Sequence, residues 1–290
     1  MKGKINIVFG TTASGKTDYA VKLAEELDGE IVNCDSMQVY SDIPIITAQP
    51  TAKEKRSIVH HLFGYIAPIN HCNVGAWLKD VVPIVKDIKE RGKTPLLVGG
   101  TGMYIKSVVE GLDEMPVISD SVKEKIHEFQ ALSDEKLFKI LEKMDKKSAK
   151  ILSHNDTQRI LRALAVVLET GKSIVDFRKG RQSNKNFVQE DFYLIWINRE
   201  RDEVYKRINE RFDLMLESGI LKEVKALLAK YGDAAFPKAH GLPEMLAYLK
   251  NETTLQKAVE RSKQITRNYA KRQITWAKHQ MSFDEIVDCI

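Results

Sequence analysis

Residues 10–17, with the sequence GTTASGKT, meet the pattern GxxxxGK[ST] of a phosphate-binding loop. They follow an apolar run of strand length and precede a segment with helical character, which is the context that this pattern requires. Glycines let consecutive backbone N–H groups converge on phosphate oxygens, and the next helix presents its positive end to the same anion. The sequence therefore predicts phosphate binding by Gly10, Thr11, Thr12, Ala13, Ser14, Gly15, Lys16 and Thr17, with Thr17 also holding Mg²⁺.

The loop alone does not distinguish ATP, GTP or another pyrophosphate as its ligand. Nucleotide hydrolases add a carboxylate that holds the metal, but the later apolar run TPLLVGGTG ends in glycines and Thr101. The carboxylate that does end an apolar run is Asp35, in EIVNCDSMQ. Asp35 could be a metal ligand, a general base or a turn-capping residue. A guanine-reading Asn/Thr-Lys-x-Asp motif is not apparent either. The chain is therefore expected to bind a pyrophosphate group without the residues that nucleotide hydrolases use.

The elements that position these residues follow from periodicity. Strand-like runs at 4–9, 30–34 and 94–99 alternate with helical patterns, which predicts a parallel sheet with helices on its faces. Residues 119–168 are rich in charge, helical in pattern and without a strong strand candidate. A core strand returns at 192–197, and helices are expected from Arg201 nearly to the end. We predict an α/β, P-loop NTPase-like core from residues 1–112 and 191–290, with a helical insertion domain at 113–190.

Composition adds the expected compartment. The 290 residues include 43% hydrophobic types, and 45 basic side chains against 40 acidic ones give a mild net charge of +5. Cys34, Cys72 and Cys289 have no spacing suited to zinc and make an unlikely disulfide framework, as in the reducing cytoplasm. With no signal-peptide layout and no apolar run of membrane-spanning length, we expect a cytoplasmic protein.

Basic residues gather on the last long helical segment. Lys263, Arg267, Lys271 and Lys278 fall within an arc of roughly 80° at helical spacing, with Ile265, Tyr269 and Trp276 opposite. A solvated amphipathic helix is the ordinary explanation of such a stripe. A polyanionic partner such as nucleic acid is the alternative, and other basic residues favour it: Arg159, Arg162, Arg178, Lys179, Arg181 and Lys185.

Several stretches together resemble the bacterial tRNA dimethylallyltransferases, also called tRNA isopentenyltransferases. The matching stretches are GTTASGKT, NCDSMQVYSDIPIITAQPT, HHLFGYI, RGKTPLLVGGTGMYIKSVVEGL, DTQRILRAL, RINERFDLMLESGILKEVKALL and TRNYAKRQITWAKHQ. They keep the order of that family and span nearly the whole chain. The resemblance implies transfer of a dimethylallyl group from dimethylallyl diphosphate to N6 of the adenosine adjacent to the anticodon in tRNA. Diphosphate would be the leaving group that the loop holds.

The resemblance also implies roles for individual residues. Lys16 and the loop N–H groups would bind the diphosphate with Arg201 and Arg207, and Thr17 would help to hold the Mg²⁺ cofactor. Asp35 would be the general base, and Thr101 would lie beside the reacting centre. The anticodon stem-loop of tRNA would contact Asp35, Ser36, Met37, Gln38, Thr101, Lys123, Gln158, Arg159, Ile160, Leu161, Arg162, Arg267 and Lys271. A monomer is expected.

The sequence departs from the family pattern at a few positions. Thr11 stands where the family usually has Pro, Ile46 where it has Gly, and Ala165 where it commonly has Glu, while HGLPEM replaces GYKE. Three other functions fit some of the residues: an ATP-binding small-molecule kinase, an RNA-binding nucleotide switch, and a prenyltransferase acting on free adenine nucleotides. The basic C-terminal helical segment favours tRNA over the kinase and the free-nucleotide prenyltransferase, and the missing guanine-reading motif argues against the nucleotide switch.

Overall fold

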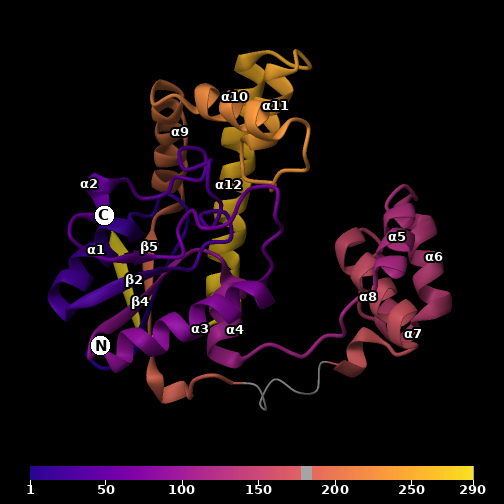
Figure 1. The fold of residues 1–290 in the computed structure, drawn as a ribbon, viewed down its shortest axis with the longest axis horizontal. Coiled ribbons are helices and arrows are strands. Elements are labelled where there is room, and N and C mark those ends of the chain that lie inside the picture. The colour runs from indigo at the N-terminus through magenta and orange to yellow at the C-terminus, as the bar shows by residue number, and fades with distance from the viewer. Residues whose placement is uncertain (178–184, 290) are drawn as a thin grey trace. The chain divides into compact units, whose positions relative to one another are not determined.

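The computed structural model describes residues 1–177 and 185–289. Over these residues it contains one sheet of parallel strands in the order β3-β2-β4-β1-β5-β6 (Figure 1). The strands are β1 Ile5–Gly10, β2 Gly29–Asn33, β3 His60–His61, β4 Thr94–Gly99, β5 Phe192–Arg199 and β6 Glu285–Cys289.

The helices begin directly after the first strand and make up most of the rest of the described chain. They are α1 Lys16–Leu27, α2 Ala52–Lys55, α3 Val74–Glu90, α4 Gly102–Glu110, α5 Asp120–Phe129, α6 Asp134–Met144, α7 Lys146–Ala149, α8 Thr157–Thr170, α9 Arg201–Glu217, α10 Ile220–Tyr231, α11 Leu242–Leu249 and α12 Leu255–Gln280, with 3₁₀ turns η1 Ile174–Phe177 and η2 Gln189–Asp191. Within the described ranges, no helix is both long and apolar enough to cross a membrane.

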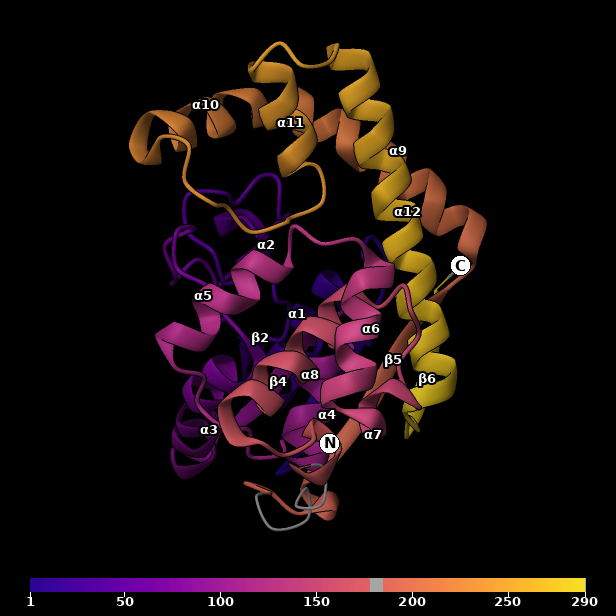
Figure 2. The ribbon, with the colours of Figure 1, turned by 90° about the vertical axis from the view of Figure 1, so that its right-hand side faces the viewer.

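The chain divides into two compact units. One consists of residues 1–109 and 186–290 and holds the sheet, and the other consists of residues 110–185. The second unit is the helical insertion, in which α5 and α6 pack on α8 and α7 packs on α6 (Figure 2). Its core includes Leu137, Leu141 and Ile160, all fully buried. The boundaries predicted from the sequence, 112 and 190, differ from those of the units by three and five residues.

Alternating side chains of the sheet enter two separate cores, as expected for a parallel sheet covered on both faces. Ile7 and Phe9 of β1 point to the larger core, which helices α3, α4 and α9–α12 help to form. Val8 of the same strand points to the smaller core against α1. Every residue of β1, β2 and β4 is buried, and these strands are mostly apolar in the sequence, interrupted only by buried polar residues: Asn6, Glu30, Asn33 and Thr94.

The strand register brings three loops together at one edge of the sheet. Phe9 lies beside Gly99, and Asn33 lies beside Val98, so β1, β2 and β4 end at nearly the same level. Glycine is required here by packing: a Cβ on Gly99 would lie 2.0 Å from the carbonyl oxygen of Cys34. The carboxyl edge of a parallel sheet is where open α/β folds bind ligands.

Two strands were not predicted. We expected helices from Arg201 nearly to the chain end, but Glu285–Cys289 forms β6, a parallel edge strand beside β5. Strand β6 is only five residues long and partly exposed, so its sequence lacks the apolar run that predicts a buried strand. Its partner strand lies about 90 positions earlier in the chain. The two-residue strand β3 is too short for any periodicity.

Helix α12 packs by a face that only partly coincides with the predicted one: Trp276 contacts the larger core as expected, but the most buried residues are others. Its buried residues are Ala258, Ser262, Thr266, Ala270, Gln273 and Ala277, whereas Tyr269 and Trp276 are half-buried. Small side chains let α12 lie close to its neighbours, and α9 runs beside it in both ribbon views (Figures 1 and 2). The predicted basic stripe is therefore not uniformly exposed: Lys263 is only 12% exposed and pairs with Asp213.

An ionic cluster fixes the opposite end of β2. Glu30 is 3% exposed, and its Oε1 and Oε2 accept hydrogen bonds from Arg91 at 2.6 and 2.9 Å. His61 Nε2 lies 2.7 Å from the same Oε2. The hydrogen bonds from Arg91 outweigh the effect of burial and lower the pKa of Glu30 to about 2. The cluster joins β2 to the end of α3 and to β3.

This cluster should make folding stability depend on acid pH. Because the folded-state pKa of Glu30 lies below its unfolded value of 4.5, its contribution is complete above pH 4.5 and is lost as pH falls toward 2. This contribution of Glu30 to the free energy of unfolding is about 3 kcal/mol at most. We expect Glu30→Gln to remove this part of the pH dependence in urea unfolding at pH 7 and pH 3. Asp87→Asn, which removes a 63%-exposed partner of the same Arg91, is the matched control and should cost under about 1 kcal/mol.

Candidate functional site

The loop between β1 and α1 has the backbone shape of an anion-binding nest. Gly15 has φ of 93°, and Ala13, although it is not glycine, has φ of 62°. The carbonyl of Thr11 accepts hydrogen bonds from Ser14 N at 3.2 Å and from Lys16 Nζ at 3.3 Å, which closes the turn. Left-handed backbone at Ala13 is the kind of local strain that clusters at functional sites. The nest and the N-terminus of α1 together suit a phosphate group.

Three arginines hold this loop from β5 and α9. Arg207 Nε donates to the carbonyl of Ala13 at 2.9 Å, and Arg199 Nε donates to that of Ser14 at 3.3 Å. Arg211, one helical turn after Arg207, donates to Thr12 Oγ1. The sequence indicated Arg207 but missed Arg199 and Arg211, although the spacing of four between Arg207 and Arg211 was a usable signal.

Arg201, the other predicted diphosphate arginine, is placed differently. It is the first residue of α9, its side chain is 61% exposed, and its ion partner is Asp202 at 3.9 Å. Arg199, Arg207 and Arg211 form the arginine cluster of the loop, and Arg201 lies outside this cluster.

Positive charge is in excess around the loop. Burial lowers the pKa of Lys16 to about 8, with Arg211 acting in the same direction and Asp35 in the opposite one. Burial is the main cause that lowers the pKa of Arg211 to about 10. The positive charge of Arg207 lowers this pKa further, and the negative charge of Asp35 opposes both effects. Buried cations that repel one another are stabilised by a negatively charged ligand, and most of all by one with several charges.

Asp35 reaches the same region from the loop after β2. Its backbone N–H donates to Asn33 Oδ1 at 2.9 Å, and its Oδ1 accepts from the N–H of Met37 at 2.9 Å. The neighbouring Ser36 donates its N–H to Thr101 Oγ1 at 3.0 Å. The structure therefore brings together the predicted catalytic residues Asp35 and Thr101, with Ser36 between them.

Gln273 of α12 joins two sides of the site. Its Oε1 accepts from the N–H of Thr12 at 2.9 Å, and its Nε2 donates to the carbonyl of Gly100 at 2.8 Å. A Cβ on Gly100 would lie 2.2 Å from Nε2, so this contact requires glycine. Gln273 was not predicted, because nothing local in the sequence marks a buried glutamine on a helix of polar residues.

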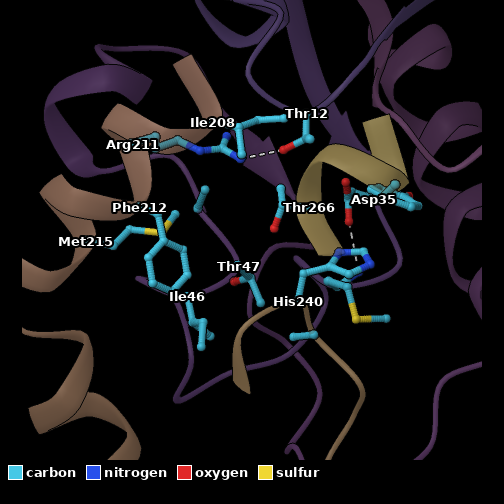
Figure 3. A pocket seen from close by; sticks show the side chains of 14 residues that line it. Thr12, Asp35, Ile46, Thr47, Ile208, Arg211, Phe212, Met215, His240 and Thr266 are labelled. Atoms are coloured by element: carbon cyan, nitrogen blue, oxygen red, sulfur yellow. Dashed lines mark hydrogen bonds between the residues drawn. The ribbon is translucent and has the colours of Figure 1, made fainter. Parts of the chain in front are cut away.

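A pocket opens beside these groups, and its walls differ in character. Ile46, Phe212 and Met215 lie on one side, Asp35 and His240 on the other, and the Arg211–Thr12 pair on a third (Figure 3). Tyr269, Thr47 and Thr266 add hydroxyl groups to the lining. The pocket thus combines a cationic phosphate-loop corner, a carboxylate and an apolar wall.

Two further groups of this pocket have altered acidity. Burial, and then the charge of Arg272, lowers the pKa of His240, which favours the neutral ring. Burial, and then Asp35, raises the pKa of Tyr269, which keeps the phenol protonated. Their rings lie 4.5 Å apart between centroids. Neither residue was predicted, although His240 stands in the segment HGLPEM that departs from the family pattern.

The predicted RNA-contacting residues fall into distinct groups. On α8, Gln158, Arg159 and Arg162 are at least partly exposed, Leu161 is half-buried, and Ile160 is fully buried in the core of the insertion. The expectation that the whole segment faces RNA is therefore wrong for the side chain of Ile160.

The remaining predicted RNA contacts are engaged to different degrees. Gln38 Nε2 donates to the carbonyls of Thr47 at 3.1 Å and Ala48 at 2.7 Å, so this side chain stabilises the part of the loop after β2 that lines the pocket. Arg267 donates to Asn209 and Gln264, whereas Lys271 is exposed. Lys123 is 63% exposed and pairs with Asp120. The predicted basic residues Arg178, Lys179 and Arg181 lie outside the described residues.

Comparisons with known proteins agree with one another. The IPP transferase family model matches residues 38–280, and the isopentenyl transferase model matches residues 3–63. The tRNA dimethylallyltransferase of Wolbachia pipientis wMel is 41% identical over all of this chain and 97% of its own length. That of Ehrlichia chaffeensis is 40% identical over 95% of this chain and 91% of its own.

Solved structures give the same result. The tRNA isopentenylpyrophosphate transferase of Bacillus halodurans is 33% identical, with a TM-score of 0.70 over 99% of this chain and 90% of its own. A eukaryotic dimethylallyltransferase, described as acting on tRNA, is 28% identical, with a TM-score of 0.80 over 99% of this chain and 74% of its own. The P-loop NTPase-like α/β prediction is thereby confirmed. By sequence over its whole length and by fold, the chain belongs to the IPP transferase family, alongside proteins named tRNA dimethylallyltransferase.

Proposed function

We propose that the protein transfers the dimethylallyl group of dimethylallyl diphosphate to N6 of the adenosine adjacent to the anticodon in tRNA, releasing diphosphate. The observation that carries this proposal is the pocket itself, which holds Arg211, Asp35 and Phe212 on three different walls. A prenyl diphosphate needs a cationic end and an apolar end in one cavity, and an amine acceptor needs a base. The names of the relatives support the same donor and acceptor.

The loop and the arginine cluster would bind the donor by its diphosphate. Backbone N–H groups of the nest, Lys16 and the guanidinium groups are positive and fixed in place before the donor arrives. Such preorganised groups stabilise the charge that grows on diphosphate as the carbon–oxygen bond breaks. This makes the loop a leaving-group site.

Asp35 would act on the acceptor. As the prenyl C1–N6 bond forms and the C1–O bond of the donor breaks, the amine must lose one proton. The Asp35 carboxylate lines the pocket and can take that proton, while the pair of electrons of the C1–O bond leaves with diphosphate. Thr101, through its contact with Ser36, would hold the Asp35 loop in position.

Mg²⁺ fits this site as a companion of the diphosphate. Residues 1–177 and 185–289 contain no cluster of three or more His, Cys, Asp or Glu side chains that could hold a metal. Mg²⁺ commonly binds through few protein oxygens together with substrate phosphates and water. The hydroxyl of Thr17, at the start of α1, is the oxygen offered here. When bound, the ion would neutralise charge on the diphosphate.

Exposed basic residues supply contacts for the anticodon stem-loop. Arg159 is 73% exposed, and Lys271 and Arg162 are also exposed. A base inside a stacked loop cannot reach a pocket, so the target adenosine would be flipped out into it. Gln158, beside Arg159 on α8, is also exposed and would add a further contact to the RNA.

The decisive experiment supplies labelled dimethylallyl diphosphate together with unmodified tRNA, with AMP, or with neither. We expect label in tRNA at N6 of the adenosine next to the anticodon, and none in AMP. Transfer to AMP alone would indicate an adenylate prenyltransferase, and phosphate transfer from ATP to a small acceptor would indicate a kinase.

Asp35→Asn should lower the rate of prenyl transfer without weakening binding of the donor. Because the amide cannot accept the amine proton, we expect the single-turnover rate to fall on the order of 10² to 10⁴-fold. Diphosphate affinity, measured by calorimetry, should stay within a few-fold of wild type. Asp28→Asn, at an 81%-exposed aspartate, is the control and should leave the rate unchanged. A rate for Asp35→Asn close to wild type would contradict its assignment as the base.

Lys16 should couple anion binding to proton uptake. Its pKa of about 8 means that much of it is neutral at pH 9, and a bound anion favours the charged form. Diphosphate binding should therefore take up protons at pH 9, and affinity should fall as pH rises above about 8. Calorimetry in two buffers of different ionisation enthalpy measures the uptake. Lys16→Met, with a similar length, should lose the lysine part of it, and equal uptake in both proteins would contradict this linkage.

The arginines of α8 should contribute to the salt dependence of tRNA binding. Removing the side chain that neutralises one phosphate should reduce the slope of log affinity against log salt by about 0.7–0.9. We expect Arg159→Gln with Arg162→Gln to lower affinity and slope, with the single-turnover rate at saturating tRNA unchanged. Lys139→Gln, at a 66%-exposed residue of α6 in the same unit, is the control. An unchanged slope in the double variant would remove α8 from the RNA-binding surface.

A further inference from the structure

A small cavity lies beside the phosphate-binding loop, apart from the pocket of Figure 3. Four polar residues line it: Lys16, Thr17, Gln38 and His60. Its apolar lining includes Ile31 of β2 and Val98 of β4, which belong to the core on the side of α1. None of the described residues lines both this cavity and the pocket of Figure 3. The space open to the centre of a water molecule is about 10 Å³, so the cavity can hold one water.

His60 has one buried ring nitrogen for which the described residues supply no partner. Its Nδ1 lies 2.9 Å from the carbonyl oxygen of Ile58, and because a carbonyl can only accept, Nδ1 carries the hydrogen. Nε2 is then an acceptor, and it is buried and unpaired within residues 1–177 and 185–289. Burial lowers the pKa of His60, which favours this neutral ring. A buried acceptor is unfavourable without a donor, and the cavity that His60 lines is where a donor can reach it.

Of the other polar residues of the cavity, Thr17 has the hydrogen that needs an acceptor. Gln38 already uses both hydrogens of Nε2 on backbone carbonyls of its own loop. Lys16 Nζ donates to the carbonyl of Thr11 and is one of the cations of the phosphate loop. A threonine hydroxyl has a single hydrogen, and an oxygen that faces a cation must direct that hydrogen elsewhere. The hydroxyl of Thr17 is therefore the group on which His60 can act.

The following step rests on the proposed function, in which Thr17 offers its hydroxyl oxygen to Mg²⁺. We propose that His60 positions Thr17 through one water in the cavity, which donates to His60 Nε2 and accepts the hydrogen of the Thr17 hydroxyl. The lone pairs of that oxygen are then left for the cation beside the diphosphate. Loss of a group that orients a metal ligand typically lowers metal affinity by about 10–100-fold. His60 is thus a positioning residue, which acts through Thr17.

The test measures how much Mg²⁺ strengthens the binding of inorganic diphosphate, by calorimetry with and without Mg²⁺ and without turnover. His60→Phe keeps a ring beside Phe63, whose ring centroid lies 5.5 Å from that of His60, but has no acceptor. We expect it to reduce the strengthening by Mg²⁺ at least about 10-fold, and to leave the Mg²⁺-free affinity within a few-fold of wild type. His60→Gln, which can place an amide oxygen near the position of Nε2, should recover most of the loss.

Two further variants make the test specific to this link. His61→Phe is the matched control, because it changes the neighbouring residue, which pairs with Glu30 and does not line the cavity. It should lower thermal stability and leave the effect of Mg²⁺ unchanged. Thr17→Val removes the hydroxyl at similar shape and should lose the effect of Mg²⁺. Adding His60→Phe to it should then cause no further loss, because both residues act on one interaction. Thermal unfolding of each variant confirms that it is folded at the assay temperature.

The results for this role and for the proposed function can be told apart. If His60→Phe keeps the wild-type effect of Mg²⁺ while Thr17→Val loses it, the positioning role is overturned and the proposed function stands. If His60→Phe and His60→Gln weaken diphosphate binding equally with and without Mg²⁺, His60 serves packing alone, and the role is also overturned. Diphosphate binding by wild type that does not depend on Mg²⁺ would overturn it as well. If wild type binds diphosphate with Mg²⁺ as expected but transfers no prenyl group to tRNA, the proposed function fails and the role of His60 stands.

Discussion

The concentration of positive charge at the end of β1 is the constraint around which the candidate site is organised. Lys16 and the arginine cluster stand close together where burial already disfavours charge, and Asp35 is the acidic group that offsets them. Such an arrangement is unfavourable for the protein alone. It persists because each arginine donates to a loop carbonyl or hydroxyl, so the cations are also structural ties. The loop is thereby held in its strained conformation by the same groups that attract an anion.

Holding the cations there requires elements from distant parts of the chain. Arg199 ends β5, and Arg207 and Arg211 belong to α9, almost two hundred residues after the loop. Helix α12 closes the arrangement through Gln273, which bonds the N–H of Thr12 and the carbonyl of Gly100. Because its buried residues are mostly small, α12 can approach closely enough for one glutamine to span both loops. A displacement of α12 would therefore break hydrogen bonds both at the phosphate loop and at Gly100, next to Thr101.

The apolar wall of the pocket restricts which kind of anion the neighbouring cations can bind. A phosphorylated hydrocarbon needs an apolar surface beside its phosphate site, and here Phe212, Met215 and Ile46 lie within the same pocket as Arg211. Phe212 and Met215 come from α9, the helix that also supplies Arg207 and Arg211. A single helix thus lines both the charged and the hydrocarbon parts of the pocket, which fixes the distance between them.

Much of this was predictable from local pattern. The loop sequence, the buried strands at 5–10, 29–33, 94–99 and 192–199, and the helical insertion follow from residue types that dictate nearby backbone. Asp35 and Thr101 could be foreseen beside one another, because parallel strands end at a common edge. In these cases the physical cause lies within a few residues of the effect, or in a general rule of sheets.

Only the tertiary structure decided which distant side chains complete the site. Arg201 and Arg207 looked equivalent in the sequence, yet helical geometry points Arg207 at Ala13 and leaves Arg201 exposed beside Asp202. Strand β6 exists because β5 offers it an edge, and its own residues signal little. Lys263 and Arg267, which appeared as a free basic stripe, are engaged by Asp213 and Asn209 of α9. Each of these outcomes depends on a partner far away in the chain, and a local pattern contains no information about which partner the fold will supply.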